Sequence, residues 1–490
     1  MKRYFSVDLG AESGRCIAGT LEGGKLILDE LHRFPTQGFP VTGSLHWNIY
    51  RFYEEILAGL RKYVERYGRE LCSVGVDAWG VDYGLLDRHK RLLGLPYCYR
   101  DSRITGTAAA VLPHKEWLYR KTGIQFLEIN TLNQLIAEKA DTDSPLDQAE
   151  GLLFIGDLLH MLLGASPACE YTIASISMLV NTGEKQWDNE IFERFGIPAK
   201  LQTPICFAGD RIGVLRDDIA DGVGLDRGVR IIAPAVHDTA SAALAIPAAD
   251  EDFAYISSGT WSIAGIELDK PVLNEAACDM NISNSGGVLG KSLFLKNVMG
   301  LWIIQQCKKQ WNRTQPTLDY DGIMTQAEKA QPFFAFIDPD DDCFFNPGNM
   351  PAAICDYLTK TGQPAVAADD IGRISRIVHE SLALKYRYVL ERIQQVTHKR
   401  IGALHIIGGG SKNTLLNTFI AGALNTPVLA GPAEGTAMGN LLMQAYGCGD
   451  VSSIGRIRQI VAASTEIGTF KPADPAPWQE AYGRFLRFLP

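Results

Sequence analysis

The sequence predicts an α/β protein of two domains with a cleft between them. Strand-like apolar runs are mixed with helical patterns in both halves of the chain. A strand, a turn rich in Gly and hydroxyl residues and a second strand run from 4 to 21, and this order recurs from 253 to 266. The small, acidic segment 247–252 separates apolar segments, so we predict domains 1–246 and 247–490.

Local patterns predict the individual elements. Apolar runs predict strands at 4–9, 15–21, 25–34, 73–77, 229–233, 253–257 and 404–407. Apolar residues at helical spacing predict helices at 49–64, 299–311, 371–389, 414–424 and 436–445. We also expect residues 84–86 to pair with 92–95 around Arg88 and His89.

Composition limits the class of protein. The chain has 490 residues, of which 46% are hydrophobic and 21% charged, as in soluble globular proteins. A net charge of -9 argues against a broad nucleic-acid surface. The ten cysteines include no C-x-x-C pair, so we expect reduced thiols and a cytoplasmic protein. Ionisable residues interrupt the most apolar runs, so we expect no membrane span.

Asp238 is a charged residue in a largely apolar segment. It would follow the strand 229–233 and begin a small-residue helix, which would let it face a cleft. Burying a carboxylate costs several kcal/mol unless the group is paired or used. A helix N-cap is the alternative. We favour a functional role because the loop 258–262, rich in Gly and hydroxyl groups, follows closely.

Two turns, one in each half, suit phosphate groups. Between Asp8 and Arg15 lies a glycine turn whose backbone N–H groups can approach a phosphate. Asp8 can hold a magnesium ion (Mg2+) through water, and Arg15 adds positive charge. In the other half, Thr260 can donate its hydroxyl to a phosphate oxygen. The alternatives are an ordinary hairpin with a surface Arg, and a polar turn beside a core Trp261.

A third glycine segment, 408–410, follows a predicted strand and precedes a helix. Its spacing matches neither the P-loop nor the dinucleotide fingerprint. Three glycines allow a phosphate or a flat ligand to approach closely, and tight strand–helix packing is the alternative. Asn297 and Gln305 can bond a nucleotide base or ribose, and a helix cap followed by an apolar helix face is the alternative.

Sugar recognition is indicated by the segment 77–82. Asp77, Trp79 and Gly80 follow one strand, and a Trp face beside hydrogen-bonding groups suits a sugar ring. A core Trp followed by a turn is the alternative. The polar segment 99–103 adds further groups, although a solvated run of charges is usually the better explanation of such a segment.

Together these motifs resemble the FGGY family of carbohydrate kinases over essentially the whole chain. The separated blocks that carry the resemblance, in order, are 7–15, 77–82, 94–96 with 99–103, 123–127, 237–242, 257–262, 296–302 and 405–410. Two departures are plain. Glu12 stands where a small hydroxyl residue is common, so any contact there would be through its backbone, and the FGGY tetrapeptide itself is absent.

The resemblance implies two ribonuclease-H-like domains of the actin and hexokinase type, the first binding sugar and the second nucleotide. It implies that Asp238 is the catalytic base and that ATP and magnesium are required. The implied ATP-binding residues are Ala11, Glu12, Ser13, Gly14, Arg15, Thr260, Asn297, Gln305, Gly409 and Gly410. The implied substrate-binding residues are Asp77, Trp79, Gly80, His237, Asp238 and Thr239, with Asp8 as the metal contact.

The activity implied by the resemblance is transfer of the γ-phosphoryl group of MgATP to the C1 hydroxyl of L-rhamnulose. Another ketose of similar size, such as L-fuculose or xylulose, is the nearest alternative. An ATPase of the actin or Hsp70 type, or a non-catalytic sugar sensor, is a more distant one. We expect a ketose and ATP as the partners, no nucleic acid, no membrane, and a monomer or homodimer.

Overall fold

The computed structural model of the chain describes residues 1–472 and 474–489. Two compact units make up the chain, and neither is continuous in sequence. The first unit consists of Met1–Pro247, Glu267–Phe294 and Gly435–Thr465, and the second of Ala248–Ile266, Leu295–Glu434 and Glu466–Pro490. The assignment of sugar binding to 1–246 and of nucleotide binding to 247–490 stays a prediction.

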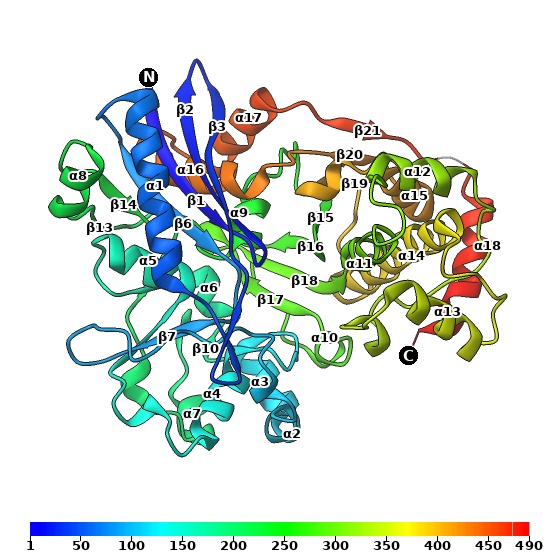
Figure 1. Cartoon of the computed structure of the whole chain (residues 1–490), viewed down its shortest axis with the longest axis horizontal. Coiled ribbons are helices and arrows are strands. Elements are labelled where there is room, and N and C mark those ends of the chain that lie inside the picture. Colours follow the sequence, from blue (N-terminus) through cyan, green and yellow to red (C-terminus); the bar gives the residue numbers. More distant parts are fainter. Residues whose placement is uncertain (473, 490) are drawn as a thin grey trace. The chain divides into compact units, whose positions relative to one another are not determined.

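A six-stranded mixed sheet forms the centre of the first unit (Figure 1). Its strands run in the order β13 (Arg211–Val214), β14 (Arg230–Ile232), β6 (Ser73–Ala78), β1 (Lys2–Leu9), β2 (Ser13–Glu22) and β3 (Lys25–Pro35). β1 pairs antiparallel with β2 and parallel with β6, and β14 also lies parallel to β6. The carboxyl ends of β1, β6 and β14 therefore meet at one edge of the sheet.

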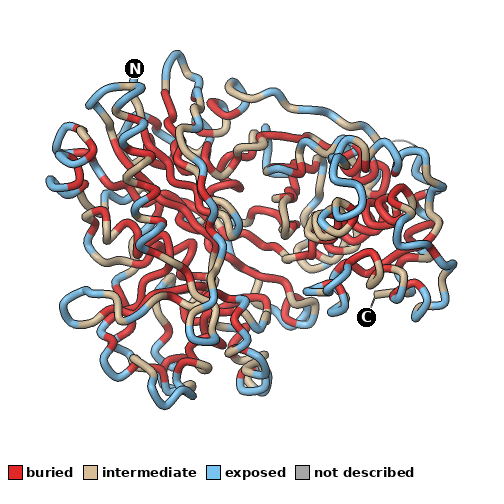
Figure 2. The backbone as a smooth tube through the Cα atoms, viewed as in Figure 1, coloured by how far each residue is buried: buried red, intermediate tan, exposed pale blue. Residues whose placement is uncertain are grey.

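Helices cover both faces of this sheet. On one face lies α1 (Ile49–Tyr67), where a Cβ on Gly59 would come within 2.7 Å of the Cys16 Cβ, and α5 (Ile155–Leu163) packs beside β6. On the other face lies α16 (Gly435–Gly447), which packs on β1 and β6 and against α9 (Asp238–Leu244). The strands between the helices are red in Figure 2, because both of their faces are buried.

The start of α1 illustrates how local sequence sets the ends of a helix. The Asn48 side chain caps its first turn by accepting a hydrogen bond of 3.0 Å from the Arg51 N–H. Apolar residues at helical spacing then face the sheet. The helix ends at Gly68, whose φ of 82° is favourable for glycine.

Smaller elements surround the first sheet. The short strands are β4 (Phe39–Val41), β5 (Ser44–His46), β7 (Tyr83–Leu86), β8 (Gly151–Phe154), β9 (Cys169–Glu170), β10 (Val180–Asn181), β11 (Gln186–Trp187) and β12 (Ile205–Cys206). The helices are α2 (Ala108–Val111), α3 (Lys115–Thr122), α4 (Thr131–Ala140), α6 (Tyr171–Ser175), α7 (Asn189–Phe195), α8 (Asp217–Val223), α10 (Glu275–Asp279) and α17 (Ile454–Ser464).

A second sheet repeats the order of the first around β15. Its seven strands run as β17 (Ser283–Gly286), β18 (Ser292–Met299), β16 (Trp261–Leu268), β15 (Phe253–Ser258), β19 (Ala403–Ile407), β20 (Val428–Ala430) and β21 (Gly468–Phe470). β15 pairs antiparallel with β16 and parallel with β19, as β1 does with β2 and β6. The duplicated architecture predicted from the two turns is therefore present.

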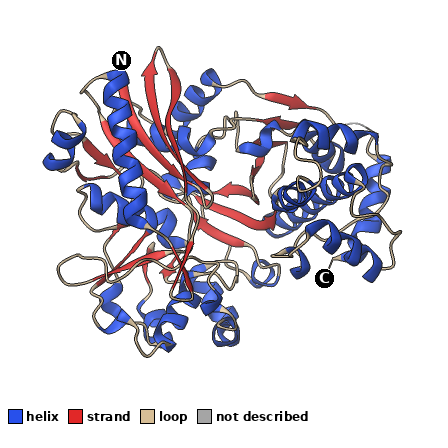
Figure 3. Cartoon of the chain, in the orientation of Figure 1, coloured by secondary structure: helices blue, strands red, loops and turns tan. Residues whose placement is uncertain are grey.

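The helices of the second unit gather around the 27-residue α14 (Ile371–Thr397), as Figure 3 shows. α14 contacts α11 (Trp302–Trp311), α12 (Tyr320–Lys329), α15 (Thr414–Leu424) and α18 (Ala476–Phe485), and α13 (Met350–Lys360) packs on α11. No helix in the described residues is long and apolar enough to cross a membrane.

Two local predictions were wrong. The helix expected from residue 299 begins at Trp302, because Met299 and the residues before it belong to β18. Residues 84–86 were expected to pair with 92–95, but β7 pairs with β8, and only Leu86 bridges to Leu92. β7 takes its partner from a distant part of the chain, and β18 lies between β17 and β16 in the second sheet. The local pattern reveals neither pairing.

Candidate active site

Three carboxylates are positioned by adjacent parallel strands of the first unit. Asp8 and Asp77 are directly paired residues of β1 and β6. Ala78 bridges to His237, which places Asp238 next along the same edge. Burial, and then the nearby Asp8 charge, raises the pKa of both Asp77 and Asp238, so the three groups lie close together. The first unit therefore brings together the predicted base, a predicted sugar contact and the predicted metal contact.

Asp238 is the first residue of α9. Its Oδ1 accepts hydrogen bonds from the N–H and the hydroxyl of Thr239, at 2.5 and 3.1 Å, and one third of its side chain is exposed. The N-cap is His237, which makes no capping bond with its side chain. Burial of the carboxyl, together with Asp8, raises the pKa of Asp238 to about 7. A carboxyl with this pKa can take up a proton near neutral pH.

His237 itself is neutral at pH 7. Its side chain is largely buried, and this burial lowers the pKa of the imidazole to about 4. The ring Nε2 lies 3.6 Å from Oδ1 of Asp238. Because it carries no positive charge, His237 leaves Asp238 able to accept a proton.

Asp77 is fully buried and is held by α16. Asn440 donates a hydrogen bond of 2.5 Å to its Oδ2 and accepts one of 2.6 Å from Gln444. Gln444 also donates to the Phe5 carbonyl and accepts from the Ser73 hydroxyl. Burial, then the Asp8 charge, raises the pKa of Asp77 well above its usual range. The sequence reasoning missed both amides, whose sole signal was their i, i+4 spacing on an apolar helix.

Trp79 is more buried than a sugar platform would need to be. It is 6% exposed, its ring lies 4.3 Å from that of Trp47, and its indole N–H donates to Asp82. Asp82 also accepts hydrogen bonds from the Trp47 indole, the Tyr99 backbone and Gln134. A sugar contact by Trp79 stays a prediction, and Asp82 is the residue that anchors this aromatic cluster.

Gly80 lies in a narrow space beside Trp79. A Cβ on Gly80 would come within 2.1 Å of Cδ1 of Ile176, the end of a flexible side chain, so Ile176 would have to move to make room for it. The role of Gly80 in binding sugar stays a prediction, and the Ile176 side chain beside it is a packing contact that the sequence did not reveal.

The turn between β1 and β2 places Arg15 against Asp8, with which it forms an ion pair. The backbone of this turn is fixed by a hydrogen bond of 3.0 Å from the Gly10 N–H to the Ser13 carbonyl. The Thr36 hydroxyl also donates a hydrogen bond to the Gly10 carbonyl. Glu12 is exposed, and Ala11 and Ser13 are partly exposed. Gly14 is buried against the Phe34 ring, so packing accounts for this glycine.

In the second unit, the turn between β15 and β16 meets the start of α11. Thr260 donates a hydrogen bond of 3.3 Å to the side-chain oxygen of Gln305. The backbone N–H groups of Leu301 and Trp302 donate to the carbonyls of Gly259 and Thr260. Two predicted ATP-binding residues are therefore in contact. A third, Asn297, lies near the end of β18, in a strand and not at the start of a helix as its pattern suggested.

The three glycines after β19 have different surroundings. Gly408 has a φ of 80°, and a Cβ on Gly410 would lie 2.0 Å from the Ser258 hydroxyl. Nothing lies within 4 Å of a Cβ placed on Gly409, which is part of the short 3-10 helix Gly409–Lys412. Backbone conformation and packing explain Gly408 and Gly410, whereas Gly409 is open to a ligand.

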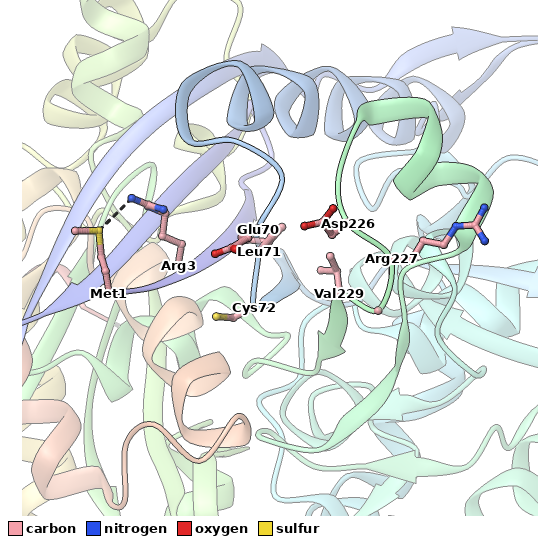
Figure 4. Close-up of a pocket in the computed structure, with 9 residues that line it drawn as sticks. Met1, Arg3, Glu70, Leu71, Cys72, Asp226, Arg227 and Val229 are labelled. Carbon is pink, nitrogen blue, oxygen red and sulfur yellow. Dashed lines mark hydrogen bonds between the residues drawn. The ribbon is translucent and has the colours of Figure 1, made fainter.

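Within the residues that the structure describes, no three His, Cys, Asp or Glu side chains gather into a metal-binding group. A surface cavity of about 220 Å³ is lined by Arg3, Cys72, Asp226, Val229 and their neighbours (Figure 4). It lies where β6 and β14 begin, at the opposite end of these strands from Asp77 and Asp238, so it is separate from the carboxylates.

Comparison with known proteins identifies the family. The FGGY family of carbohydrate kinases is matched by its N-terminal domain at residues 3–245 and by its C-terminal domain at 254–448. The chain therefore belongs to the FGGY family of carbohydrate kinases, which confirms the resemblance seen in the motifs. It is 41% identical to the rhamnulokinase of Bacteroides thetaiotaomicron over 486 residues, which cover 99% of each protein. It is 36% identical to that of Bacillus subtilis, covering 96% of each.

Solved structures share the fold. The ligand-bound xylulose kinase of Lactobacillus acidophilus matches with a TM-score of 0.82 at 15% identity, covering 99% of this chain and 97% of that one. Glycerol kinase of Plasmodium falciparum with ADP matches with a TM-score of 0.78 at 14% identity, covering 99% and 98%. The predicted two-domain α/β fold is therefore confirmed.

Proposed function

We propose that this protein phosphorylates L-rhamnulose at the C1 hydroxyl with ATP and releases L-rhamnulose 1-phosphate and ADP. The observation that carries the choice of sugar is similarity to rhamnulokinases over almost the whole chain, with 41% identity to that of Bacteroides thetaiotaomicron. The observation that supports the chemistry is the carboxylate of Asp238, partly exposed at the start of α9.

Asp238 is the proposed general base. It takes the proton from the C1 hydroxyl while that oxygen attacks the γ-phosphorus of MgATP and the bond to the β-phosphate oxygen breaks. The proton ends on Asp238 and the electron pair leaves with ADP. A pKa of about 7 suits this role, because roughly half of the groups are ionised at neutral pH while proton affinity stays high.

MgATP is the proposed phosphoryl donor. Backbone N–H groups of residues 11–15 and the Thr260 hydroxyl would hold its phosphates, with Arg15 adding positive charge. Asn297, Gln305 and the segment of Gly409 and Gly410 would hold the nucleoside. Asp8 offers a carboxylate oxygen to magnesium, which prefers few protein ligands and retains much of its water.

The sugar would be held by groups at the edge of the first sheet. Asp77, His237, Thr239 and Asp238 supply hydrogen-bonding atoms, and Trp79 and Gly80 supply the surface beside them. Ketoses differ from one another mainly in the orientation of hydroxyl groups. A site with buried polar groups discriminates strongly against a misplaced hydroxyl, because a buried partner is then left unpaired.

A panel of ketoses tests the proposal. The purified protein is given MgATP with L-rhamnulose, L-fuculose, D- and L-xylulose and glycerol, and ADP and sugar phosphate are both measured. We expect the highest kcat/KM for L-rhamnulose and one sugar phosphate per ADP. A higher value for another ketose would reassign the substrate. ATP turnover that ignores every sugar would favour the ATPase alternative.

We also propose a cytoplasmic protein that is a monomer or homodimer. All ten cysteines are free thiols, which suits a reducing compartment. Sedimentation of the purified protein would give its oligomeric state, and fractionation of cells would give its location.

A further inference from the structure

The backbone that leads into Asp238 is held by two side chains from the start of α6. The carboxylate of Glu170 accepts a hydrogen bond of 3.0 Å from the Val236 N–H. The Thr172 hydroxyl accepts one of 3.2 Å from the His237 N–H and donates to the same oxygen of Glu170. Two successive amides before Asp238 are therefore tied to one carboxylate, one directly and one through a hydroxyl.

Capping of α6 does not account for this arrangement. Glu170 is the N-cap residue of α6 and accepts a hydrogen bond of 3.0 Å from the Thr172 N–H, which is the usual capping bond. The bonds to Val236 and from Thr172 to His237 reach a different segment, 66 and 65 residues away. A cap needs no such partners, so the pair serves the segment 236–238 as well.

Glu170 is fully buried, and burying its carboxyl costs free energy of folding. Burial raises the pKa of Glu170 to about 7, although several hydrogen bonds oppose the shift. A second buried carboxyl, Asp157 of α5, accepts from the Glu170 N–H at 3.2 Å. Burying a carboxyl costs free energy unless hydrogen bonds compensate for it. One of the compensating bonds comes from the segment that leads into Asp238, which favours a role for Glu170 there.

The other side of the segment 236–238 is also fixed. The Val236 carbonyl accepts from the Ala78 N–H at 2.8 Å, and the Ser241 hydroxyl donates to the Ala235 carbonyl at 2.7 Å. These bonds tie the segment to β6 and to α9. Only the amides of Val236 and His237 depend on the pair Glu170 and Thr172, so changing that pair would loosen the approach to Asp238 from one direction.

We propose that Thr172 and Glu170 are positioning residues that set the orientation of the Asp238 carboxylate. The inference rests on the proposed role of Asp238 as the base. Neither residue touches the reacting atoms. They act through the backbone of 236–237, and a displacement of the base by about 1 Å is enough to lower turnover about 100-fold.

The variant Thr172→Val removes the hydroxyl and keeps the shape of the side chain. We expect kcat for the preferred ketose to fall about 10- to 100-fold, while the KM for ATP changes less than about twofold. Thr172→Ser restores the hydroxyl and should recover kcat to within about threefold of wild type. A purely structural role would lower the melting temperature and the active fraction without this pattern of rescue.

Thr203→Val is the matched control. The Thr203 hydroxyl is also buried, donates to the Leu152 carbonyl at 2.7 Å and accepts from the Leu152 N–H at 3.2 Å, but it serves β8. We expect Thr203→Val to keep the wild-type kcat. Wild-type kcat in Thr172→Val, or an equal loss in Thr203→Val, would overturn the inference.

Two further variants keep the test decisive. If Thr172→Val does not fold, Glu170→Gln weakens the same acceptor and should lower kcat about 3- to 30-fold; wild-type kcat would then overturn the inference. Asp238→Asn separates the two proposals. Activity retained in Asp238→Asn contradicts the base, whereas activity lost there but kept in Thr172→Val contradicts the positioning role alone.

Discussion

The side-chain amide of Asn440 donates a hydrogen bond of 2.5 Å to the carboxylate of Asp77, although 363 residues separate them in sequence. Asp77 is in turn paired in register with Asp8 on the neighbouring strand. The helix α16, from the last part of the chain, therefore holds one member of a carboxylate group whose members all come from the first half.

Removing the proposed base should abolish turnover and spare nucleotide binding. Asp238→Asn keeps the size of the side chain but cannot accept a proton, so we expect kcat to fall about 100- to 10,000-fold. The dissociation constant of ATP, measured by calorimetry, should change less than about twofold. Asp221→Asn alters an exposed, ion-paired aspartate of the same unit and serves as the control. Turnover that survives in Asp238→Asn would refute the assignment.

The pH dependence of the reaction should report the raised pKa of Asp238. The base is active only when ionised, and its pKa is about 7. Below that pH, kcat/KM for the ketose should therefore fall about tenfold per pH unit, and above about pH 8 it should level off. The Asp8 charge contributes to the shift, so Asp8→Asn should move the fall to lower pH. An unchanged midpoint in that variant would contradict the coupling of the two carboxyls.

The open position of Gly409 gives a test for the nucleotide site. A Cβ at Gly409 meets nothing, so Gly409→Ala should leave the melting temperature unchanged. If ATP lies against this backbone, the KM for ATP should nevertheless rise about tenfold or more. Gly410→Ala forces a Cβ to within 2.0 Å of Ser258 and should cost about 1–3 kcal/mol of stability. Wild-type KM for ATP in Gly409→Ala would remove this segment from the proposed site.

Packing of α16 on α9 should be intolerant of any side chain at Gly439. A Cβ there would lie 1.9 Å from the Ser241 carbonyl oxygen, which is backbone and cannot rotate away. We expect Gly439→Ala to cost at least about 1–3 kcal/mol and to lower kcat, because α9 begins with Asp238. Gly222 lies in the helix α8, where an added Cβ meets nothing within 4 Å. Gly222→Ala should therefore stabilise the protein by about 0.5–1 kcal/mol through helix propensity. Urea unfolding of both variants distinguishes packing from helix propensity.

His160 should make the protein less stable in mild acid. It is buried, its Nε2 accepts from the Val76 N–H at 2.8 Å, and burial lowers its pKa to about 3. The unfolded chain takes up this proton near pH 6.5, whereas the folded form does not until about pH 3. The stability contributed by neutral His160 is therefore complete above pH 6.5 and is lost as pH falls, by up to about 1.4 kcal/mol per unit.

The comparison of urea midpoints at pH 7.5 and pH 5.0 measures this effect. The free energy of unfolding should fall between pH 7.5 and pH 5.0, and this fall should be smaller in His160→Gln than in the wild type by about 2 kcal/mol. His89→Gln changes an exposed histidine and should leave the decrease as it is. Equal decreases in wild type and His160→Gln would show that His160 is protonated in the folded protein.

Much of the fold was predictable because its signals are local. The strand and turn patterns at 4–21 and 253–266 identified the repeated architecture, and the predicted helix 414–424 coincides with α15. The predictions that were wrong concerned residues near 84–95 and 299, whose place in a strand pair the local pattern does not reveal. β7 takes β8 as its partner, and residues near 297 take their place in β18, because pairing between strands depends on the whole sheet.

The candidate site was predictable in its local features but not in the contacts between distant residues. The sequence by itself determined that Asp238 follows a strand and begins a helix, and that glycine turns follow the first strand of each half. Only the tertiary structure decided that Asp8 lies beside Asp77, that Asn440 holds Asp77, and that Glu170 and Thr172 hold the backbone before Asp238. The reason is physical: residue type and periodicity act over a few neighbours, whereas the pKa and orientation of a buried carboxyl depend on groups that folding brings from distant parts of the chain.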